Sequence, residues 1–412
     1  MIYITIPDNN VSERKYILEV LFEEFLGLDI TISTGAQHYE IKLENRSSLT
    51  VKDRFFNNFP KGLSYLNIKN IPHCLKEIDI FAASFFMLTR WEEYVNKTRD
   101  KHLRFPASAS LASQRNFLNR PVVNEMVDTL KSLLLQQDPS LTFKIEQKQL
   151  ILTHDVDRLY FWRNYKQCLK IVAGDLLKRR DISLALKRTK EFMMLKQGKI
   201  KDPFDTFDLL MDKSEAIGVK SRFYFMSGGE SPYDNAYKID DPQVQTLIDK
   251  IKTKGHIIGI HPSYDAYNNI QIFQQEKVAL EQVCQCTIEE GREHYLRFEV
   301  PTTWQIWEDE NMKFDSTCGY ADQEGFRCGT GDAFSVFNIL TRKKLKLKER
   351  PLILMDASLF EYNNNSYPQA IEKVNNLQNA CNTFTMLWHN SSIKHMKFYG
   401  ELLEKNSINR TE

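Results

Sequence analysis

The chain has 412 residues, of which 42% are hydrophobic and 26% are charged. At about 100–200 residues per domain, this length predicts two or three domains with sizeable apolar cores. Lys and Arg number 55 and Asp and Glu 54, so the formal charge of +1 argues against a general nucleic-acid-binding role. The 16 glycines and 13 prolines are too few for a collagenous or low-complexity chain.

Two features of the sequence bear on the compartment. No apolar run approaches the roughly 20 residues of a membrane-spanning helix, and residues 1–8 lack the basic and long apolar regions of a signal peptide. The seven cysteines include a C-x-C pair, Cys284 and Cys286, but form neither a disulfide framework nor a C-x-x-C zinc pattern. We therefore expect a cytoplasmic protein with reduced thiols.

The first 145 residues mix short alternating apolar segments with helical ones, which predicts a smaller α+β domain. Helical periodicity is clear over residues 16–25 and 123–135. The turn signal Gln-Asp-Pro-Ser at 137–140 places the domain boundary near residue 145. No metal or nucleophile pattern occurs here, and we expect Arg90, Glu92 and Glu93 to lie in a domain interface.

From residue 146 onward, the pattern changes to alternating strands and helices. The predicted strands cover residues 149–153, 219–226, 256–260, 295–298, 351–355 and 383–388. Two of the intervening helices end at Gly218 and Gly255, as is typical of helix C-termini. Such alternation predicts a parallel sheet or a β/α barrel, in which the chemistry lies at the carboxyl ends of the strands.

Polar residues that suit a reactive site follow four of these strands. The first strand runs into Asp155 and Asp157, whose side chains share one face of the strand and can hold a cation together. The third strand runs into His261, the fourth into Arg297 and the last into His389. Each residue alone has an ordinary explanation, such as a helix cap or a surface ion pair. Their recurrence at successive strand ends predicts a common site.

These motifs resemble those of the polysaccharide deacetylase (NodB-homology) family of carbohydrate esterases. The resemblance covers about residues 149–405, and its matching segments are 153–157, 255–261, 297–301, 314–317 and 387–389, in the family's order. Segments 81–94 and 104–110 resemble, less specifically, the accessory domain of a branch from bacterial surface-polysaccharide biosynthesis. The resemblance implies an α/β fold: a distorted (β/α) barrel of the NodB-homology type over residues 146–412, with the N-terminal α+β domain over 1–145.

The resemblance also implies roles for the candidate residues. Asp155 would be the general base, and Arg297 would pair with it and keep it ionised. His389 would be the general acid that protonates the leaving amine, which suits a group that titrates near neutral pH. The backbone N–H near Thr302 would contribute to an oxyanion hole.

A divalent metal ion is the implied cofactor, with zinc preferred and cobalt, manganese or nickel as alternatives. Asp157 and His261 would be ligands. The family usually supplies a second histidine four residues after the first, but this chain has Asp265 there. Asp265 is either the third ligand or the cap of the following helix. His294 could turn toward the site, or it could be structural.

The implied activity is removal of an N-acetyl group from an acetamido sugar, a nucleotide- or lipid-linked intermediate of a surface polysaccharide. Tyr264, Trp304, Tyr320 and Trp388 flank the motifs and could stack on a sugar, although core packing is the alternative. His294 and Thr302 complete the candidate substrate contacts.

A basic helical insertion, residues 158–204, interrupts the strand–helix pattern. Residues 158–201 contain thirteen Lys and Arg against three Asp and Glu, a local charge of +10. The segment could contact anionic lipid at the inner face of the membrane or a diphosphate-linked sugar. A solvated helical insertion is the alternative.

Other functions stay open at this point. In glycosyltransferases, a D-x-D segment after a strand holds a metal ion and a nucleotide-sugar diphosphate, but that function leaves His261, Arg297 and His389 unused. A barrel that has lost its metal could bind sugar without catalysis. A deacylase of another amide, such as a ureide ring, would share the same residues.

Overall fold

The computed structural model describes residues 1–412 except 45–46, 57–78, 235–236 and 409–412. Two β-sheets organise the chain, a four-stranded sheet near the N-terminus and a nine-stranded sheet in the remainder. No helix among the described residues has both the length and the apolar character to cross a membrane. The six described cysteines are free, and Cys74 lies outside the described residues.

The N-terminal sheet has the strand order β2-β1-β3-β4. Its strands are β1 (Ile2–Ile6), β2 (Ile30–Thr34), β3 (Tyr39–Lys42) and β4 (Ser48–Val51). The helices of this part are α1 (Val11–Leu18), its π-helical continuation η1 (Glu19–Phe25), α2 (Ile80–Leu88), α3 (Trp91–Val95), η5 (Ala107–Ala109), α4 (Leu111–Gln114) and α5 (Val122–Gln137). The helices predicted over 16–25 and 123–135 are confirmed, and the turn at 137–140 follows α5.

The large sheet has the order β10-β11-β9-β8-β7-β6-β5-β13-β12. Its strands are β5 (Gln149–Val156), β6 (Arg222–Phe225), β7 (Ile257–Ile260), β8 (Glu290–Gly291), β9 (Phe314–Asp315), β10 (Phe334–Asn338), β11 (Lys343–Glu349), β12 (Leu354–Met355) and β13 (Thr383–Leu387). Every neighbouring pair is parallel except β10 with β11. Among the described residues, β10 and β12 are edges that do not pair with each other, so the predicted closed barrel is not confirmed.

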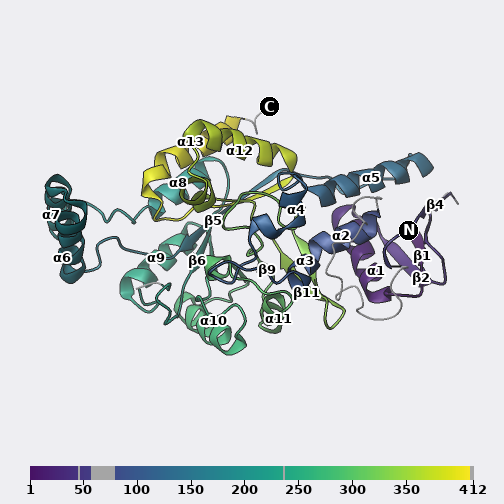
Figure 1. Ribbon diagram of the computed structural model, residues 1–412, viewed down its shortest axis with the longest axis horizontal. Coiled ribbons are helices and arrows are strands. Elements are labelled where there is room, and N and C mark those ends of the chain that lie inside the picture. Colours follow the sequence, from purple (N-terminus) through teal and green to yellow (C-terminus); the bar gives the residue numbers. More distant parts are fainter. Residues whose placement is uncertain (45–46, 57–78, 235–236, 409–412) are drawn as a thin grey trace.

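Helices cover both sides of this sheet. They are α8 (Phe207–Ala216), α9 (Pro242–Thr253), α10 (Ile270–Cys284), α11 (Thr302–Asp309), α12 (Tyr367–Ala380) and α13 (Met396–Ile408), with short turns η7 (His294–Leu296), η8 (Ser358–Tyr362) and η9 (Ile393–His395). In Figure 1, α8, α12 and α13 lie above the strands and α9, α10 and α11 below them. Residues 150–156 of β5 are therefore buried on both faces, as the apolar run of that strand predicts.

The strand predicted over 295–298 is wrong. The fourth parallel strand is β8, Glu290–Gly291, and a short helical turn follows it. Tyr295 and Leu296 have φ values of 61° and 54°, in the left-handed region that an extended strand excludes. Gly291 fits here because a Cβ at this position would lie 2.0 Å from the backbone oxygen of Ile260. Arg292, and not Arg297, is therefore the arginine at the end of the fourth strand.

The basic insertion forms a helical hairpin. It consists of α6 (Tyr165–Gly174), the π-helical turn η6 (Asp175–Arg179) and α7 (Ile182–Lys196). Figure 1 shows α6 and α7 standing beyond the rest of the chain, joined to it by two extended segments.

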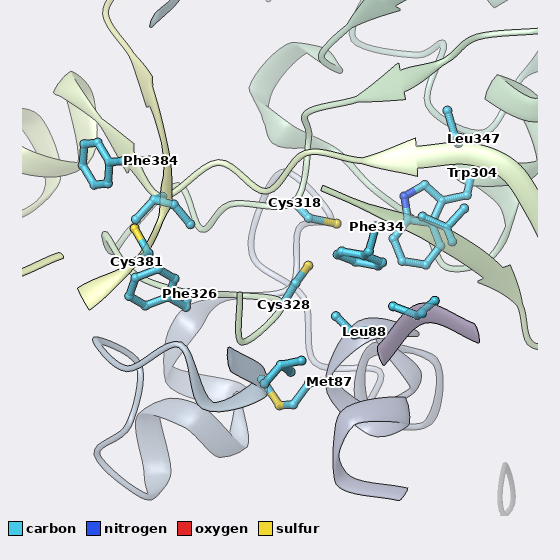
Figure 2. Close-up of a cluster of buried hydrophobic side chains, with 14 of the residues drawn as sticks. Met87, Leu88, Trp304, Cys318, Phe326, Cys328, Phe334, Leu347, Cys381 and Phe384 are labelled. Carbon is cyan, nitrogen blue, oxygen red and sulfur yellow. The ribbon is translucent and has the colours of Figure 1, made fainter. Parts of the chain in front are cut away.

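The N-terminal part packs directly on the large sheet. Figure 2 shows Met87 and Leu88 of α2 beside Cys328 and Phe334, and all four side chains are buried in one apolar cluster. The hydroxyl of Tyr16 donates a hydrogen bond of 2.9 Å to a backbone oxygen of β10. The chain thus has one continuous core across the predicted boundary near residue 145, and residues of both parts can contribute to one site.

Candidate metal centre and active site

Three candidate metal ligands converge at the carboxyl ends of β5, β7 and β8. Asp157, His261 and His294 each offer an atom within 4.8 Å of the others, and both imidazoles are buried. Nε2 of His261 lies 3.2 Å from Oδ1 of Asp157, and Nε2 of His294 lies 3.8 Å from the same oxygen. One carboxylate and two imidazoles form a donor set typical of catalytic zinc sites, which leave a further position open.

One carboxylate oxygen of Asp157 has no hydrogen-bond donor among the described residues, which leaves it free to bind a cation. Its Oδ1 is buried and has no hydrogen-bond partner, which is costly for a carboxylate oxygen unless a metal ion or water binds it. Burial raises the pKa of Asp157, but the imidazoles of His261, His294 and His389 outweigh burial and hold this pKa well below its usual range. The carboxylate is therefore ionised and available as a ligand.

Each imidazole is oriented through its other ring nitrogen. Nδ1 of His261 lies 2.6 Å from the backbone oxygen of Arg292, and Nδ1 of His294 lies 3.3 Å from Oδ1 of Asp234. With Nδ1–H donating to these oxygens, Nε2 is the atom that each ring can offer to a metal ion beside Asp157. Such partners fix the ring and raise the basicity of a metal ligand.

We expect Asp234→Asn to weaken zinc binding about 10- to 100-fold, because the amide is a poorer acceptor for the His294 ring. The measurement is the zinc dissociation constant by competition with a chromophoric chelator. Asp212→Asn is the control, since that carboxylate is exposed on α8 and pairs with Lys254. An unchanged dissociation constant for Asp234→Asn would contradict the assigned orientation of His294.

Asp155 lies beside this cluster, and Arg292 holds it. Nη1 of Arg292 donates to Oδ1 of Asp155 at 2.8 Å and to the Thr153 hydroxyl at 2.9 Å. The same guanidinium donates to the backbone oxygen of Ser316 at 2.8 Å and to its hydroxyl at 3.0 Å. The segment 314–317 thus fixes the arginine. Oδ2 of Asp155 lies 3.9 Å from Nε2 of His261, on the side of the metal cluster.

The expected pairing of Arg297 with Asp155 is wrong. Nη1 of Arg297 lies 3.0 Å from Oδ1 of Asp265, and its guanidinium stacks 3.9 Å from the Tyr264 ring and 4.1 Å from the Tyr267 ring. The cause is the left-handed turn after β8, which carries Arg297 away from the strand ends.

Asp265 is likewise not placed as a metal ligand. Its side chain is 64% exposed and bound to Arg297, outside the cluster that the described residues form. The loop 261–265 after β7 leads its carboxylate outward, and His294 occupies the third position instead. His294, expected as a weak substrate contact, therefore lies deeper in the site than its sequence position indicated.

His389 completes the opposite side of the site. Its Nε2 lies 3.7 Å from Oδ2 of Asp157, and its Nδ1 lies 2.7 Å from Oδ1 of Asp356. Burial lowers the pKa of His389, but the Asp356 carboxylate raises it more strongly, to about 10. The imidazole is therefore protonated at neutral pH and can donate from Nε2.

An aromatic group borders the site. The rings of Tyr233, Tyr264 and Tyr295 lie 4.6 to 5.5 Å apart, and His102 of the N-terminal part packs 4.7 Å from Tyr295. Nδ1 of His102 lies 3.0 Å from the hydroxyl of Tyr264. Nη1 of Arg104 donates to the backbone oxygen of Tyr295 at 3.1 Å. Tyr264 is thus near the site, as its position after β7 predicts.

The other aromatic candidates are core residues. Trp304 and Trp388 are fully buried and Tyr320 is 3% exposed, so of the two possibilities, stacking on a sugar and core packing, these three side chains take core packing. Trp304 donates from its indole to Glu349 at 3.0 Å. Thr302 is the first residue of α11 and is exposed, and the oxyanion role of its backbone N–H stays a prediction.

Three residues of the candidate site were missed from the sequence: Arg292, Asp234 and Asp356. Asp356 directly follows a predicted strand, so the strand-end rule could have identified it. Arg292 was hidden by the incorrect position of the fourth strand. Asp234 lies in a loop, and no local pattern identifies it.

Comparison with known proteins gives partial similarities. A model of a family of unknown function, DUF7033, matches residues 2–139. No curated protein matches the chain. Similar solved structures include a family 4 carbohydrate esterase from Streptomyces lividans in complex with acetate. The two sequences are 8% identical, the match covers 64% of this chain and 91% of that chain, and the TM-score is 0.31. The chitin deacetylase from the fungal pathogen Colletotrichum lindemuthianum is similar at 13% identity, with coverage of 64% and 85% and a TM-score of 0.32.

A CE4 family pseudoenzyme from Bacillus anthracis is also similar, at 9% identity, with coverage of 63% and 60% and a TM-score of 0.33. The neighbours thus include deacetylases and a pseudoenzyme.

Proposed function

We propose that the chain is a metal-dependent deacetylase that hydrolyses an N-acetyl group of an acetamido sugar. The observation that carries the proposal is the convergence of an arginine-held carboxylate, a metal-type cluster and an Asp-held imidazole at one sheet edge. In this proposal, the metal ion would be held by Asp157, His261 and His294. Zinc is the preferred ion, and it would supply Lewis acidity toward the acyl carbonyl and toward water.

The side chains divide the proton transfers between them. Asp155 accepts the proton of the attacking water through Oδ2, since Arg292 occupies Oδ1. His389 stands across the cluster and donates a proton from Nε2 to the departing amine, while Asp356 holds its other nitrogen. This order of proton transfers requires an acid that starts protonated, His389, and a base that starts without its proton, Asp155.

The substrate that we propose is an intermediate of a bacterial surface polysaccharide, linked to a nucleotide or a lipid. Exposed Tyr233 and the adjacent Tyr264 offer ring faces for a pyranose. The cytoplasmic location stays a prediction from the sequence.

We expect Asp155→Asn to lower kcat for acetate release by about 10²- to 10⁴-fold while the protein retains zinc. The measurement is enzymatic detection of acetate from zinc-loaded protein with UDP-N-acetylglucosamine and with N-acetylglucosamine oligosaccharides. Asp265→Asn is the matched control and keeps the wild-type rate.

Wild-type protein that holds zinc and binds these sugars without acetate release would contradict catalysis and favour a sugar-binding protein. Acetate release that Asp155→Asn leaves unchanged would contradict the role of Asp155.

A further inference from the structure

The helical hairpin, residues 165–196, has no role in the proposed reaction. Its two helices pack on each other through a small cluster that includes Trp162, Cys168 and Phe192. Figure 1 shows that the hairpin stands beyond the rest of the chain. Most side chains on a projecting hairpin face outward, so their charge and polarity indicate which kind of partner it binds.

The charge of the insertion is opposite to that of the rest of the chain. Residues 158–201 carry +10 although the whole chain carries +1, so the remaining residues together carry −9. At the turn between the helices, Arg179 and Arg188 both donate to the buried Asp175 carboxylate, through hydrogen bonds of 2.6 and 2.7 Å. Lys178 and Arg180 are exposed there, without an ion-pair partner among the described residues.

Apolar side chains are exposed beside these cations. Leu177 is 78% exposed and Ile182 67% exposed, on either side of the turn. Along the two helices, Tyr165, Leu169 and Leu186 are also exposed. The hairpin buries a separate apolar set between its helices, and of these exposed side chains Tyr165 also packs on it, with its ring 4.9 Å from that of Phe192.

The base of the hairpin is attached beside the active site. The buried amide of Asn390, the residue after His389, donates to the backbone oxygens of Arg158 and Phe204 at 2.8 and 3.0 Å. These two residues belong to the two segments that connect the hairpin to the chain. The carboxylate of Asp202 accepts from the backbone N–H groups of Phe161 and Trp162 at 2.8 and 3.0 Å. The hairpin therefore leaves the fold at a fixed point next to the reacting groups.

We propose that this hairpin docks the protein on an anionic lipid bilayer, with its turn inserted at the level of the headgroups. Lys178 and Arg180 meet lipid phosphates, while Leu177 and Ile182 enter the acyl boundary. Charge complementarity selects an anionic surface. A bilayer is favoured over an acidic protein because exposed cations lie directly between exposed apolar side chains on a projecting turn, and a bilayer offers headgroup phosphates next to an acyl region. The proposal goes beyond the deacetylase function and does not depend on it.

The test is cosedimentation of the full chain with vesicles of phosphatidylglycerol and phosphatidylcholine in equal amounts, compared with phosphatidylcholine alone. We expect wild-type protein to bind the anionic vesicles, more weakly as salt is raised. Lys178→Glu with Arg180→Glu should weaken binding at least about tenfold. Leu177→Ser with Ile182→Ser should have a similar effect.

Two matched double variants serve as controls. Lys343→Glu with Lys346→Glu reverses two exposed cations of β11, and Val278→Ser with Leu340→Ser removes two exposed apolar side chains elsewhere. Both should bind as wild type, and circular dichroism should be unchanged in all four variants, because every substitution is at an exposed position.

Wild-type binding no stronger to anionic vesicles than to phosphatidylcholine would overturn the proposal. Turn variants that bind as wild type would also overturn it. A third contrary result is a turn variant whose molar mass in light scattering differs from that of the wild type while its vesicle binding does not. The hairpin would then join copies of the chain.

Discussion

Replacing His294 with alanine should abolish stoichiometric zinc binding, whereas replacing Asp265 with alanine should leave it unchanged. His294 contributes one of three ligand atoms within 4.8 Å, and its loss leaves one carboxylate and one imidazole. Because even loss of an outer partner weakens metal sites about 10- to 100-fold, loss of a ligand should exceed about 100-fold. Metal content by mass spectrometry and zinc titration measure the effect.

Asp265→Ala is a sharp control because Asp265 occupies the position that the sequence pattern assigns to the third ligand. Its carboxylate is exposed and held by Arg297. Zinc retained by His294→Ala and lost from Asp265→Ala would reverse the assignment and require the loop after β7 to rearrange on metal binding.

The second large effect concerns stability. Glu93→Gln should lower the free energy of unfolding by about 3–5 kcal/mol, because it removes the counter-charge of buried Arg327 and leaves buried Arg90 only the Glu92 carboxylate, 3.7 Å away. Oε1 of Glu93 lies 2.8 Å from Nε of Arg90 and 2.9 Å from Nε of Arg327. All three side chains are almost fully buried where α2 and α3 meet the loop before β10. Urea unfolding at pH 7 measures the change.

The difference in unfolding free energy between wild type and Glu93→Gln should also depend on pH. Burial raises the pKa of Glu93, but the two guanidinium groups outweigh it and lower the pKa from about 4.5 to about 2. The stabilisation is therefore complete above pH 4.5 and is lost as the pH falls toward 2. The difference between wild type and Glu93→Gln, about 3 kcal/mol from this shift, should shrink over that interval.

Glu125→Gln is the control for the Glu93 substitution. It breaks an exposed pair with Arg120 and should cost less than about 1 kcal/mol. A Glu93→Gln protein as stable as wild type at pH 7 would show that the buried charges are compensated elsewhere.

The strand-end rule selected, from sequence alone, most of the side chains that the structure brings together in the candidate site. Asp155, Asp157, His261 and His389 were placed correctly because buried parallel strands are strongly apolar and their ends are easily recognised. The helices over 16–25 and 123–135 were predicted from their apolar periodicity, which is also a local signal. What these elements share is a local signal that agrees with the tertiary fold.

The exchange of Arg292 for Arg297 comes from one short strand. β8 has two residues, too few to show any periodicity, and the apolar stretch 295–298 offered a more convincing strand. Once the fourth strand is misplaced by five residues, Arg297 replaces Arg292, whereas the candidacy of Asp265 came from its place four residues after His261. The left-handed turn at Tyr295 and Leu296 depends on contacts with residues far away in sequence, so local propensity could not reveal it.

The contacts that Arg104 and His102 make with Tyr295 limit which substitutions these positions accept. Arg104 binds the main-chain oxygen of Tyr295 and not its ring, so residue 295 can be exchanged without loss of this bond, whereas Arg104 cannot. His102, by contrast, packs against the ring itself, so positions 102 and 295 are expected to covary. The N-terminal part therefore constrains which substitutions the turn at residues 294–296 can accept.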